Sequence, residues 1–328
     1  FEVFQLDDGF QAAIGDWLHT NDDFPTPVDG IAAAIAAAGR TPGIWIAPFV
    51  AGPDSAVAGS HPGWLARHAA SGSPLIGMVN DGWGGAVHTL DTTQPEVLAH
   101  LEEVAAELVA AGFPYLKLDF TYAPSMAGHY ADPGQTPAQR VRAGFEAIRR
   151  GAGDDAFLLG CGAPIGVAVG LVDGMRIGAD VGPWWHAPPE RYSPAGHEGG
   201  EPATVNAWRN TLSRSFLHRR LWLNDPDCLM LRTDETRLEP EQVRAWALAV
   251  GVSGGMALVS DDLALLGADA RALLDEVVAL GREADAGAHP PRCPDLLDAD
   301  PPTRLVTAEV ELVGDPVAGV AHVQGLLA

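Results

Sequence analysis

Lysine is almost absent from this chain of 328 residues, which has one lysine against nineteen arginines. The single lysine, Lys117, lies in the apolar run YLKLDF, two residues before Asp119. Lysine carries a compact ammonium group and arginine a broad planar fork, so the two do not replace each other in a crowded pocket. Residues two apart on a strand point the same way, so Lys117 and Asp119 are expected to share one face. A composition bias that left one lysine by chance is the alternative.

Cysteines are few, and metal-binding motifs are missing. Cys161, Cys228 and Cys293 are an odd number, widely spaced and without a CxxC pattern, which excludes a disulfide framework and indicates a reducing, cytoplasmic location. The histidines lack HxH and HxxEH spacing, which argues against zinc.

Long apolar runs and basic residues are also scarce. The apolar runs are interrupted before they reach the length of a membrane span, so no membrane partner is expected. The chain has 43 acidic and 20 basic residues, a formal charge of −23, which argues against nucleic-acid partners and suits a neutral substrate. The chain begins without Met or a signal peptide, directly in strand-like sequence, so we expect it to be part of a longer polypeptide.

Short apolar runs that end in polar residues alternate with helical segments along most of the chain. Eight such runs predict strands, at residues 3–8, 43–49, 86–91, 115–120, 157–164, 174–180, 221–227 and 256–262. Helices are expected at residues 28–39, 94–111, 137–150, 204–220, 239–251 and 268–283. Nearly continuous apolar strands are typical of buried parallel sheets, and eight strand–helix units predict an α/β fold, the (β/α)8 TIM barrel.

The main competing fold is a doubly wound sheet, which needs a glycine-rich phosphate fingerprint after its first strand. The segment LDDGFQAAIGDW has no such spacing, so the barrel is favoured. We expect a catalytic barrel at residues 1–285 and a β-rich segment at 286–328, the start of a small C-terminal β-sandwich. Residues 181–203 are expected to form a long loop, with His186 and His197 at its rim or in solvent.

Aspartates lie at the ends of six of the eight predicted strands. They are Asp7, Asp8, Asp91, Asp119, Asp180, Asp225, Asp227, Asp261 and Asp262. Active sites of barrels lie at the carboxyl ends of the strands, where this charge would converge. A single Asp after a strand is most often a helix cap or a turn residue, and we assign that role to Asp91, Asp261 and Asp262.

Two uses of such carboxylates compete, a divalent metal site and glycoside hydrolysis. The cations Lys117 and Arg176 lie on the same strands as the candidate ligands and disfavour a divalent ion, so neither a metal nor another cofactor is expected. Glycoside hydrolysis needs one carboxylate to attack the anomeric carbon and one carboxylic acid to protonate the leaving oxygen. Asp119 and Asp180 would face the same pocket, about 5–6 Å apart if the reaction retains configuration.

Tryptophans would supply flat faces for a sugar ring, and Arg176 would donate to a sugar hydroxyl. Trp45 lies inside a predicted strand, so core packing is an equal alternative for it. Trp184 and Trp185 lie in the long loop.

Five motifs resemble glycoside hydrolase family 36 α-galactosidases of the melibiase type. They are LDDGF with GDWL and DFP (6–25), PGIWIAPF (42–49), YLKLDF (115–120), GCGAPIGVAVGLVDGMRIGADVGPWW (160–185) and WLNDPDCLMLR (222–232). The resemblance covers most of residues 1–265. It implies a metal-free, retaining enzyme that releases terminal α-galactosyl groups from oligosaccharides of the melibiose and raffinose type. Family members carry a β-sandwich before the barrel, which is missing from this sequence.

The resemblance also implies roles for single residues. Asp119 corresponds to the nucleophile and Asp180 to the acid/base, with Lys117 as the cation beside the nucleophile. The hydroxyls on the O4 and O6 side would be bound by Asp7 and Asp8. Trp45 would form the aromatic wall, and the sugar's 2-hydroxyl would be surrounded by Cys161, Arg176 and Gly178. Core filling is the alternative for Cys161.

Two other functions stay open at this point. A transglycosylase of the raffinose- or stachyose-synthase type would use the same two aspartates, and a non-catalytic carbohydrate-binding barrel would need Trp45, Asp7 and Asp8 only. A homo-oligomer of the full-length protein is also left open.

Overall fold

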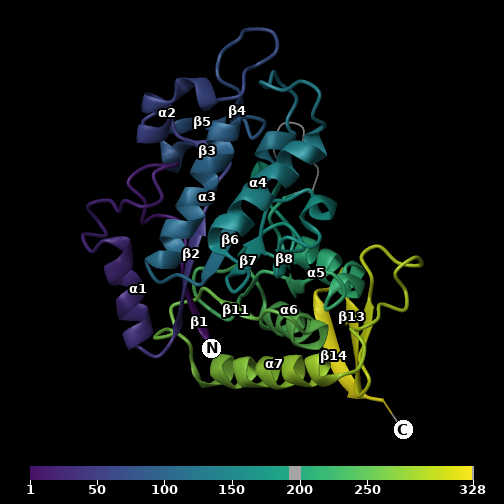
Figure 1. The fold of residues 1–328 in the computed structure, drawn as a ribbon. Helices are drawn as coiled ribbons and strands as arrows, with labels where there is room; N and C mark the ends of the chain where they lie inside the picture. Colours follow the sequence, from purple (N-terminus) through teal and green to yellow (C-terminus); the bar gives the residue numbers. More distant parts are fainter. Residues whose placement is uncertain (192–200, 327–328) are drawn as a thin grey trace. The chain divides into compact units, whose positions relative to one another are not determined.

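The computed structural model describes residues 1–191 and 201–326, which form two compact units, Phe1–Gly174 and Met175–Ala328. Figure 1 shows the helices and strands of both units. His197 and part of the predicted long loop lie outside the described residues. Within the described ranges, no helix has the length and apolar character needed to cross a membrane.

The first unit is built on four parallel strands. They are β1 (Val3–Leu6), β2 (Thr41–Ile46), β6 (Tyr115–Leu118) and β7 (Phe157–Gly160), paired in that order. All four residues of β6 are buried, as are the last five of β2, which agrees with their continuous apolar sequences.

Three longer helices alternate with these strands. They are α1 (Val28–Ala37), α3 (Pro95–Ala110) and α4 (Pro137–Ala152), each within a few residues of its predicted range. Pro95 and Pro137 open their helices at the first position, where a missing N–H costs nothing. Thr136 and Gln139 close a capping box at the start of α4. Figure 1 shows α3 and α4 packed side by side.

One predicted barrel strand is wrong. Residues 86–91 form β5 (Gly85–Thr89), which lies in an antiparallel sheet between β3 (Val50–Ala51) and β4 (Ile76–Asn80), while β2 pairs directly with β6. The turn Asp81–Trp83, followed by Gly84 and Gly85 with positive φ, closes the β4–β5 hairpin. Glycine adopts such angles without strain, so the sequence DGWGG was the missed hairpin signal. A short helix, α2 (Ala56–Ser60), precedes the hairpin.

The second unit continues the alternation of short strands and helices. Its strands include the neighbours β8 (Gly174–Arg176, from Met175 onward) and β9 (Leu223–Asp225), and the parallel pair β10 (Cys228–Leu229) and β11 (Leu258–Val259). Its helices are α5 (Thr204–Ser213), α6 (Pro240–Ser253) and α7 (Ala268–Ala286). Most of α6 is buried, because it lies between α5 and α7 and against the C-terminal strands.

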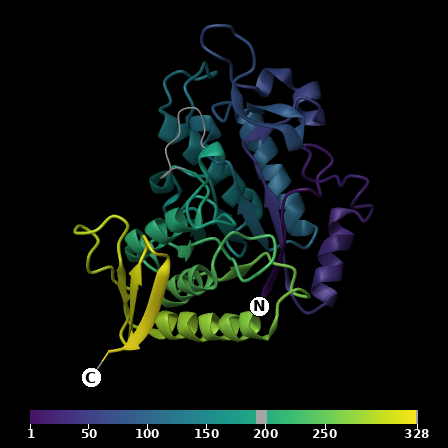
Figure 2. The same cartoon turned by 180° about the vertical axis from the view of Figure 1, so that it is seen from behind.

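The C-terminal segment is an antiparallel sheet, as predicted. It contains β12 (Arg304–Val306), β13 (Val310–Asp315) and β14 (Val320–Gly325), seen from behind in Figure 2. Leu305 and Leu312 of this sheet belong to the same core cluster as Trp208 of α5 and Trp246 of α6. The domain boundary predicted at residue 285 stays a prediction.

Candidate active site

Strand register places several predicted site residues of the first unit on one face. Trp45 of β2 is level with Lys117 of β6, which is level with Leu159 of β7. Side chains alternate along a strand, so Asp119 and Cys161, two residues further on, follow on the same face at the carboxyl ends. The prediction that Lys117 and Asp119 share a face agrees with this register.

The ammonium group of Lys117 forms an ion pair with Asp7. Lys117 Nζ lies 2.9 Å from Asp7 Oδ2, and the lysine side chain is 10% exposed whereas the aspartate side chain is 49% exposed. The other Asp7 oxygen accepts the backbone N–H of Asp8 at 2.9 Å. This pairing was not predicted, since the sequence placed the lysine only beside Asp119.

Asp8 is held by two side chains that sequence reasoning missed. Its Oδ1 accepts from Gln11 Nε2 at 2.8 Å, and its Oδ2 accepts from Trp83 Nε1 at 2.8 Å. Trp83 lies in the β4–β5 hairpin, and its ring centroid is 5.2 Å from that of Phe120. The hairpin therefore links Asp8 to the residue that follows Asp119.

Asp119 accepts one hydrogen bond on each oxygen. Trp45 Nε1 donates to Oδ2 at 3.1 Å, and the backbone N–H of Phe120 donates to Oδ1 at 2.7 Å. A carboxylate oxygen has two lone pairs, so each oxygen retains one for a substrate atom. Phe120 has φ 51°, a left-handed conformation that non-glycine residues adopt mainly where the surrounding structure imposes it. Burial raises the pKa of Tyr122, and the nearby charge of Asp119 adds to the rise.

Three aromatic rings pack around Trp45, the residue that donates to this carboxylate. Trp45, which is 1% exposed, lies 5.7 Å from Trp17, 5.8 Å from Trp83 and 6.5 Å from Phe120 between ring centroids. Trp45 is thus a core residue that also donates to Asp119, and the partly exposed rings of the cluster are Trp83 and Phe120. A direct sugar contact of Trp45 stays a prediction.

Cys161 directly follows β7, the strand that pairs with β6. Its side chain is buried, and its carbonyl accepts from Thr121 Oγ1 at 2.8 Å. The next residue, Gly162, has φ 55°, and a Cβ atom there would lie 3.2 Å from Asp119 Oδ1. The glycine therefore lets the β7 end approach the carboxylate closely.

The second unit contains a cluster of one arginine and three aspartates. Arg176 Nη1 lies 2.9 Å from Asp180 Oδ1, Nε lies 3.2 Å from Asp225 Oδ2, and Nη2 lies 2.8 Å from Asp227 Oδ1. The side chain of Asp180 is 71% exposed, whereas those of Arg176, Asp225 and Asp227 are buried. The structure thus brings Arg176 and Asp180 together, and it adds two clamping carboxylates whose role the sequence did not assign.

Burial raises the pKa of Asp227 above its ordinary value. The Arg176 cation and the Val181 N–H act against this rise, whereas the charges of Asp225 and Asp180 add to it.

Gly178 lies between Arg176 and Asp180 in the sequence. A Cβ atom at Gly178 would come within 2.9 Å of Asn210 Cβ, so only glycine fits against α5 here without a shift. Its predicted place near a sugar 2-hydroxyl stays a prediction.

The loop tryptophans do not form a matched pair of sugar platforms. Trp185 is 4% exposed, donates to the Pro316 carbonyl at 2.7 Å and packs 6.3 Å from Trp208, so its predicted sugar-facing role is wrong. The loop sequence alone does not show that Trp185 packs against α5 and shares a core cluster with the C-terminal sheet. Trp184 donates to the Pro202 carbonyl, and His186 is exposed, as expected of a rim residue.

Asp91 and Asp262 make the local turn contacts expected of them, whereas Asp261 accepts from a backbone N–H thirty residues away, so its turn or cap role is not confirmed. Asp91 accepts from Thr93 and Gln94 and from the backbone of Ala131. Asp262 accepts from the backbone of Ala264, and Asp261 from that of Leu231.

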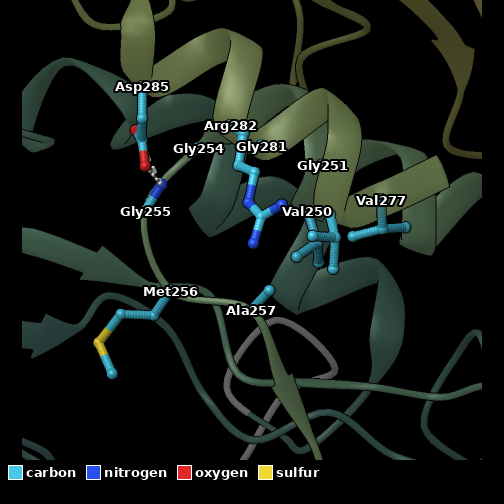
Figure 3. Close-up of a pocket in the computed structure, with 11 residues that line it drawn as sticks. Val250, Gly251, Gly254, Gly255, Met256, Ala257, Val277, Gly281, Arg282 and Asp285 are labelled. Carbon is cyan, nitrogen blue, oxygen red and sulfur yellow. Dashed lines mark hydrogen bonds between the residues drawn. The ribbon is translucent and has the colours of Figure 1, made fainter. Parts of the chain in front are cut away.

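A separate cavity lies between α6 and α7 of the second unit (Figure 3). Its volume is about 130 Å³, and Val250, Val277 and Ala257 give it an apolar wall. Asp285, at one end, contacts the Gly255 N–H at 3.2 Å and His218 Nε2 at 2.7 Å. Small-molecule sites usually measure roughly 300–1,000 Å³. This cavity holds none of the predicted site residues.

Comparisons with known proteins point to one family. A sequence model of the melibiase family matches residues 1–139. This chain is similar to TtGalA, an α-galactosidase from Thermus thermophilus whose structure was solved in complex with p-nitrophenyl α-D-galactopyranoside. The two sequences are 33% identical, and the two structures match with a TM-score of 0.76. That match covers 95% of this chain and 60% of TtGalA, so the chain spans about three-fifths of its relative's length.

More distant structures share the fold. A variant of the α-galactosidase AgaA from Geobacillus stearothermophilus, in complex with raffinose, is 16% identical with a TM-score of 0.60 over 95% of this chain and 42% of AgaA. An isomalto-dextranase from Arthrobacter globiformis, complexed with panose, is 16% identical with a TM-score of 0.64 over 95% of this chain and 56% of that one.

These likenesses confirm the predicted α/β barrel class, with antiparallel strands at its C-terminal end. Residues 1–139 thus match the melibiase family model, and the structure is similar to that of an α-galactosidase over 95% of the chain, as the sequence resemblance predicted.

Proposed function

We propose that this chain carries the catalytic residues of a retaining α-galactosidase that acts on oligosaccharides of the melibiose and raffinose type. The observation that carries the proposal is the cluster at the strand ends of the first unit. There Asp7, Asp8 and Asp119 are held by Lys117, Trp83 and Trp45 respectively. The likeness to TtGalA, whose structure contains an α-galactoside, supports the same substrate class.

The proposed reaction proceeds in two displacements. An oxygen of Asp119 attacks the anomeric carbon, the glycosidic bond breaks, and the leaving oxygen takes the proton of Asp180. A water molecule then gives its proton to Asp180 and attacks the same carbon, which breaks the ester to Asp119 and releases α-galactose. The two carboxyl groups should stand about 5–6 Å apart in a crystal structure, the retaining separation.

The fold is shared with an isomalto-dextranase, so the fold alone does not select galactose. We therefore assign the proposed galactose preference to Asp7 and Asp8. An axial 4-hydroxyl that donates to this pair distinguishes galactose from glucose, since the equatorial epimer would leave the acceptors unpaired. The ion pair with Lys117 engages Asp7 Oδ2, while Oδ1 accepts a backbone N–H and has a second lone pair that a sugar hydroxyl could use.

The experiment compares turnover of p-nitrophenyl α-galactoside and α-glucoside by the wild-type chain and by the Asp119→Ala variant. We expect turnover of the galactoside alone, and a loss of roughly 10⁶-fold in the variant, as when a covalent nucleophile is removed. NMR of early product should show α-galactose. Equal turnover of the glucoside, a β product, or unchanged activity of Asp119→Ala would each refute the proposal.

A further inference from the structure

Asp227 makes an unusually complete set of contacts for a residue with no assigned role. Its Oδ1 lies 2.8 Å from Arg176 Nη2 and accepts the Cys228 N–H at 2.7 Å. Its Oδ2 accepts the N–H of Val181 at 2.7 Å. The side chain is 7% exposed. Both oxygens are therefore committed to groups of the protein.

These contacts reach the segment of Asp180 by two routes. The first runs through the side chain of Arg176, whose Nη1 contacts Asp180 Oδ1 at 2.9 Å. The second runs through the backbone, because Val181 directly follows Asp180. A carboxylate that is 71% exposed would otherwise rotate freely, so the two restraints limit where the Asp180 carboxyl group lies.

Asp225 secures the other side of the same arginine. Its Oδ2 lies 3.2 Å from Arg176 Nε, and its Oδ1 accepts the backbone N–H of Asp227 at 2.8 Å. The planar guanidinium thus has two corners fixed by buried carboxylates, and the third is directed at Asp180. A lysine ammonium could not present three corners in this fixed plane.

The backbone at Asp227 is also unusual. Its φ is 90°, in the region that favours glycine, and no glycine stands there. Such conformations persist where other contacts over-determine them, and they cluster at functional sites. The three hydrogen bonds and ion pairs of the Asp227 carboxylate are contacts of that kind.

We propose that Asp227 is a positioning residue for acid catalysis, which holds Arg176 and the backbone after Asp180 so that the Asp180 carboxyl group meets the leaving oxygen. This inference rests on the proposed function. It assigns Asp227 no contact with the sugar. General acid catalysis matters most when the leaving group is a poor one, so the loss of positioning should depend on the leaving group.

The test compares kcat/KM for melibiose, whose leaving group is a sugar alkoxide, with that for p-nitrophenyl α-galactoside, whose leaving group needs little protonation. For Asp227→Asn we expect a loss of roughly 10²-fold or more on melibiose, within the range for general acid catalysis. The loss on the nitrophenyl substrate should be at least tenfold smaller. Equal losses on both substrates would overturn the proposal.

Asp91→Asn is the matched control. Asp91 is 2% exposed and accepts several hydrogen bonds, but it lies in the first unit and outside the catalytic cluster. Any loss in this variant should be the same for both substrates. A change in its substrate ratio equal to that of Asp227→Asn would mean that the ratio reports general destabilisation, and the proposal would fail.

A double variant distinguishes positioning from folding. Asp180→Ala should change the substrate ratio by itself, and adding Asp227→Asn should change it no further, because the group to be positioned is gone. Additive changes would contradict the proposal. If Asp227→Asn does not fold, Asp225→Asn should change the substrate ratio in the same way, because Asp225 also holds Arg176. An unchanged substrate ratio in Asp225→Asn would contradict the proposal. Failure of wild-type turnover would refute the proposed function instead.

Discussion

The two units hold their carboxylates in different ways. In the first unit, Asp8 and Asp119 accept from neutral indole, amide or backbone N–H groups, and Asp7 pairs with the Lys117 cation. In the second unit, one buried guanidinium faces three carboxylates. Neutral donors leave acceptor capacity for sugar hydroxyls and for attack on carbon, whereas the ionic cluster fixes geometry. The first arrangement suits binding and nucleophilic attack, and the second suits positioning of an acid.

The largest expected difference between the units is in stability. Arg176→Leu would leave the buried Asp225 and Asp227 without their cation, and loss of one partner from a buried ion pair costs about 3–5 kcal/mol. Lys117→Leu would leave Asp7, which is half exposed and can be hydrated, so its cost should be ~1 kcal/mol or less. Urea unfolding measures both. Similar losses in the two variants would break the comparison.

A smaller effect is expected from the neutral donor to Asp8. Trp83→Phe keeps a ring against Trp45 and Phe120 but removes the N–H that orients the carboxylate. A hydrogen bond of ~1 kcal/mol corresponds to a rise in KM for α-galactosides of roughly fivefold. The control is Trp64→Phe, since Trp64 is a partly buried tryptophan of the same unit that stacks on His61. An unchanged KM in Trp83→Phe would remove Trp83 from the site.

The smallest effect expected is the pH dependence of stability through Asp227. Burial raises the pKa of this carboxyl group when the protein is folded. The folded state then binds the proton more tightly than the unfolded state, so the contribution to stability is full below the unfolded pKa, about 4, and is lost as pH rises through the folded pKa. The unfolding free energy of the wild type minus that of Asp227→Asn should therefore fall as pH rises. Urea titrations at several pH values would measure it, and a difference that grows with pH would contradict the assignment.

Much of the first unit could be predicted because its signals are local. The two-residue period of a strand places Lys117 and Asp119 on one face, and proline and glycine mark where helices α3 and α4 begin and end. The strand at β5 was assigned to the wrong sheet, because a strand of five residues reads the same in a parallel and an antiparallel sheet. The glycine-rich turn before it was the available signal.

Contacts between distant segments could not be predicted in the same way. Trp83 is 75 residues from Asp8, and Asp225 is 49 residues from Arg176, with no periodic pattern to connect them. Trp185 reads as an exposed loop residue, yet it is buried against Trp208 and the carbonyl of Pro316.

The amino-acid sequence by itself determined the alternation of strands and helices, the family-like motifs and the aspartates at the strand ends. These features depend on hydrophobic periodicity, helix capping and turn residues, which act between neighbours in the sequence. Only the tertiary structure decided which donor holds each aspartate and which tryptophans are buried. Those outcomes depend on strand register and on the packing of a hairpin or a helix from far along the chain, and neither is encoded in any local stretch of residues.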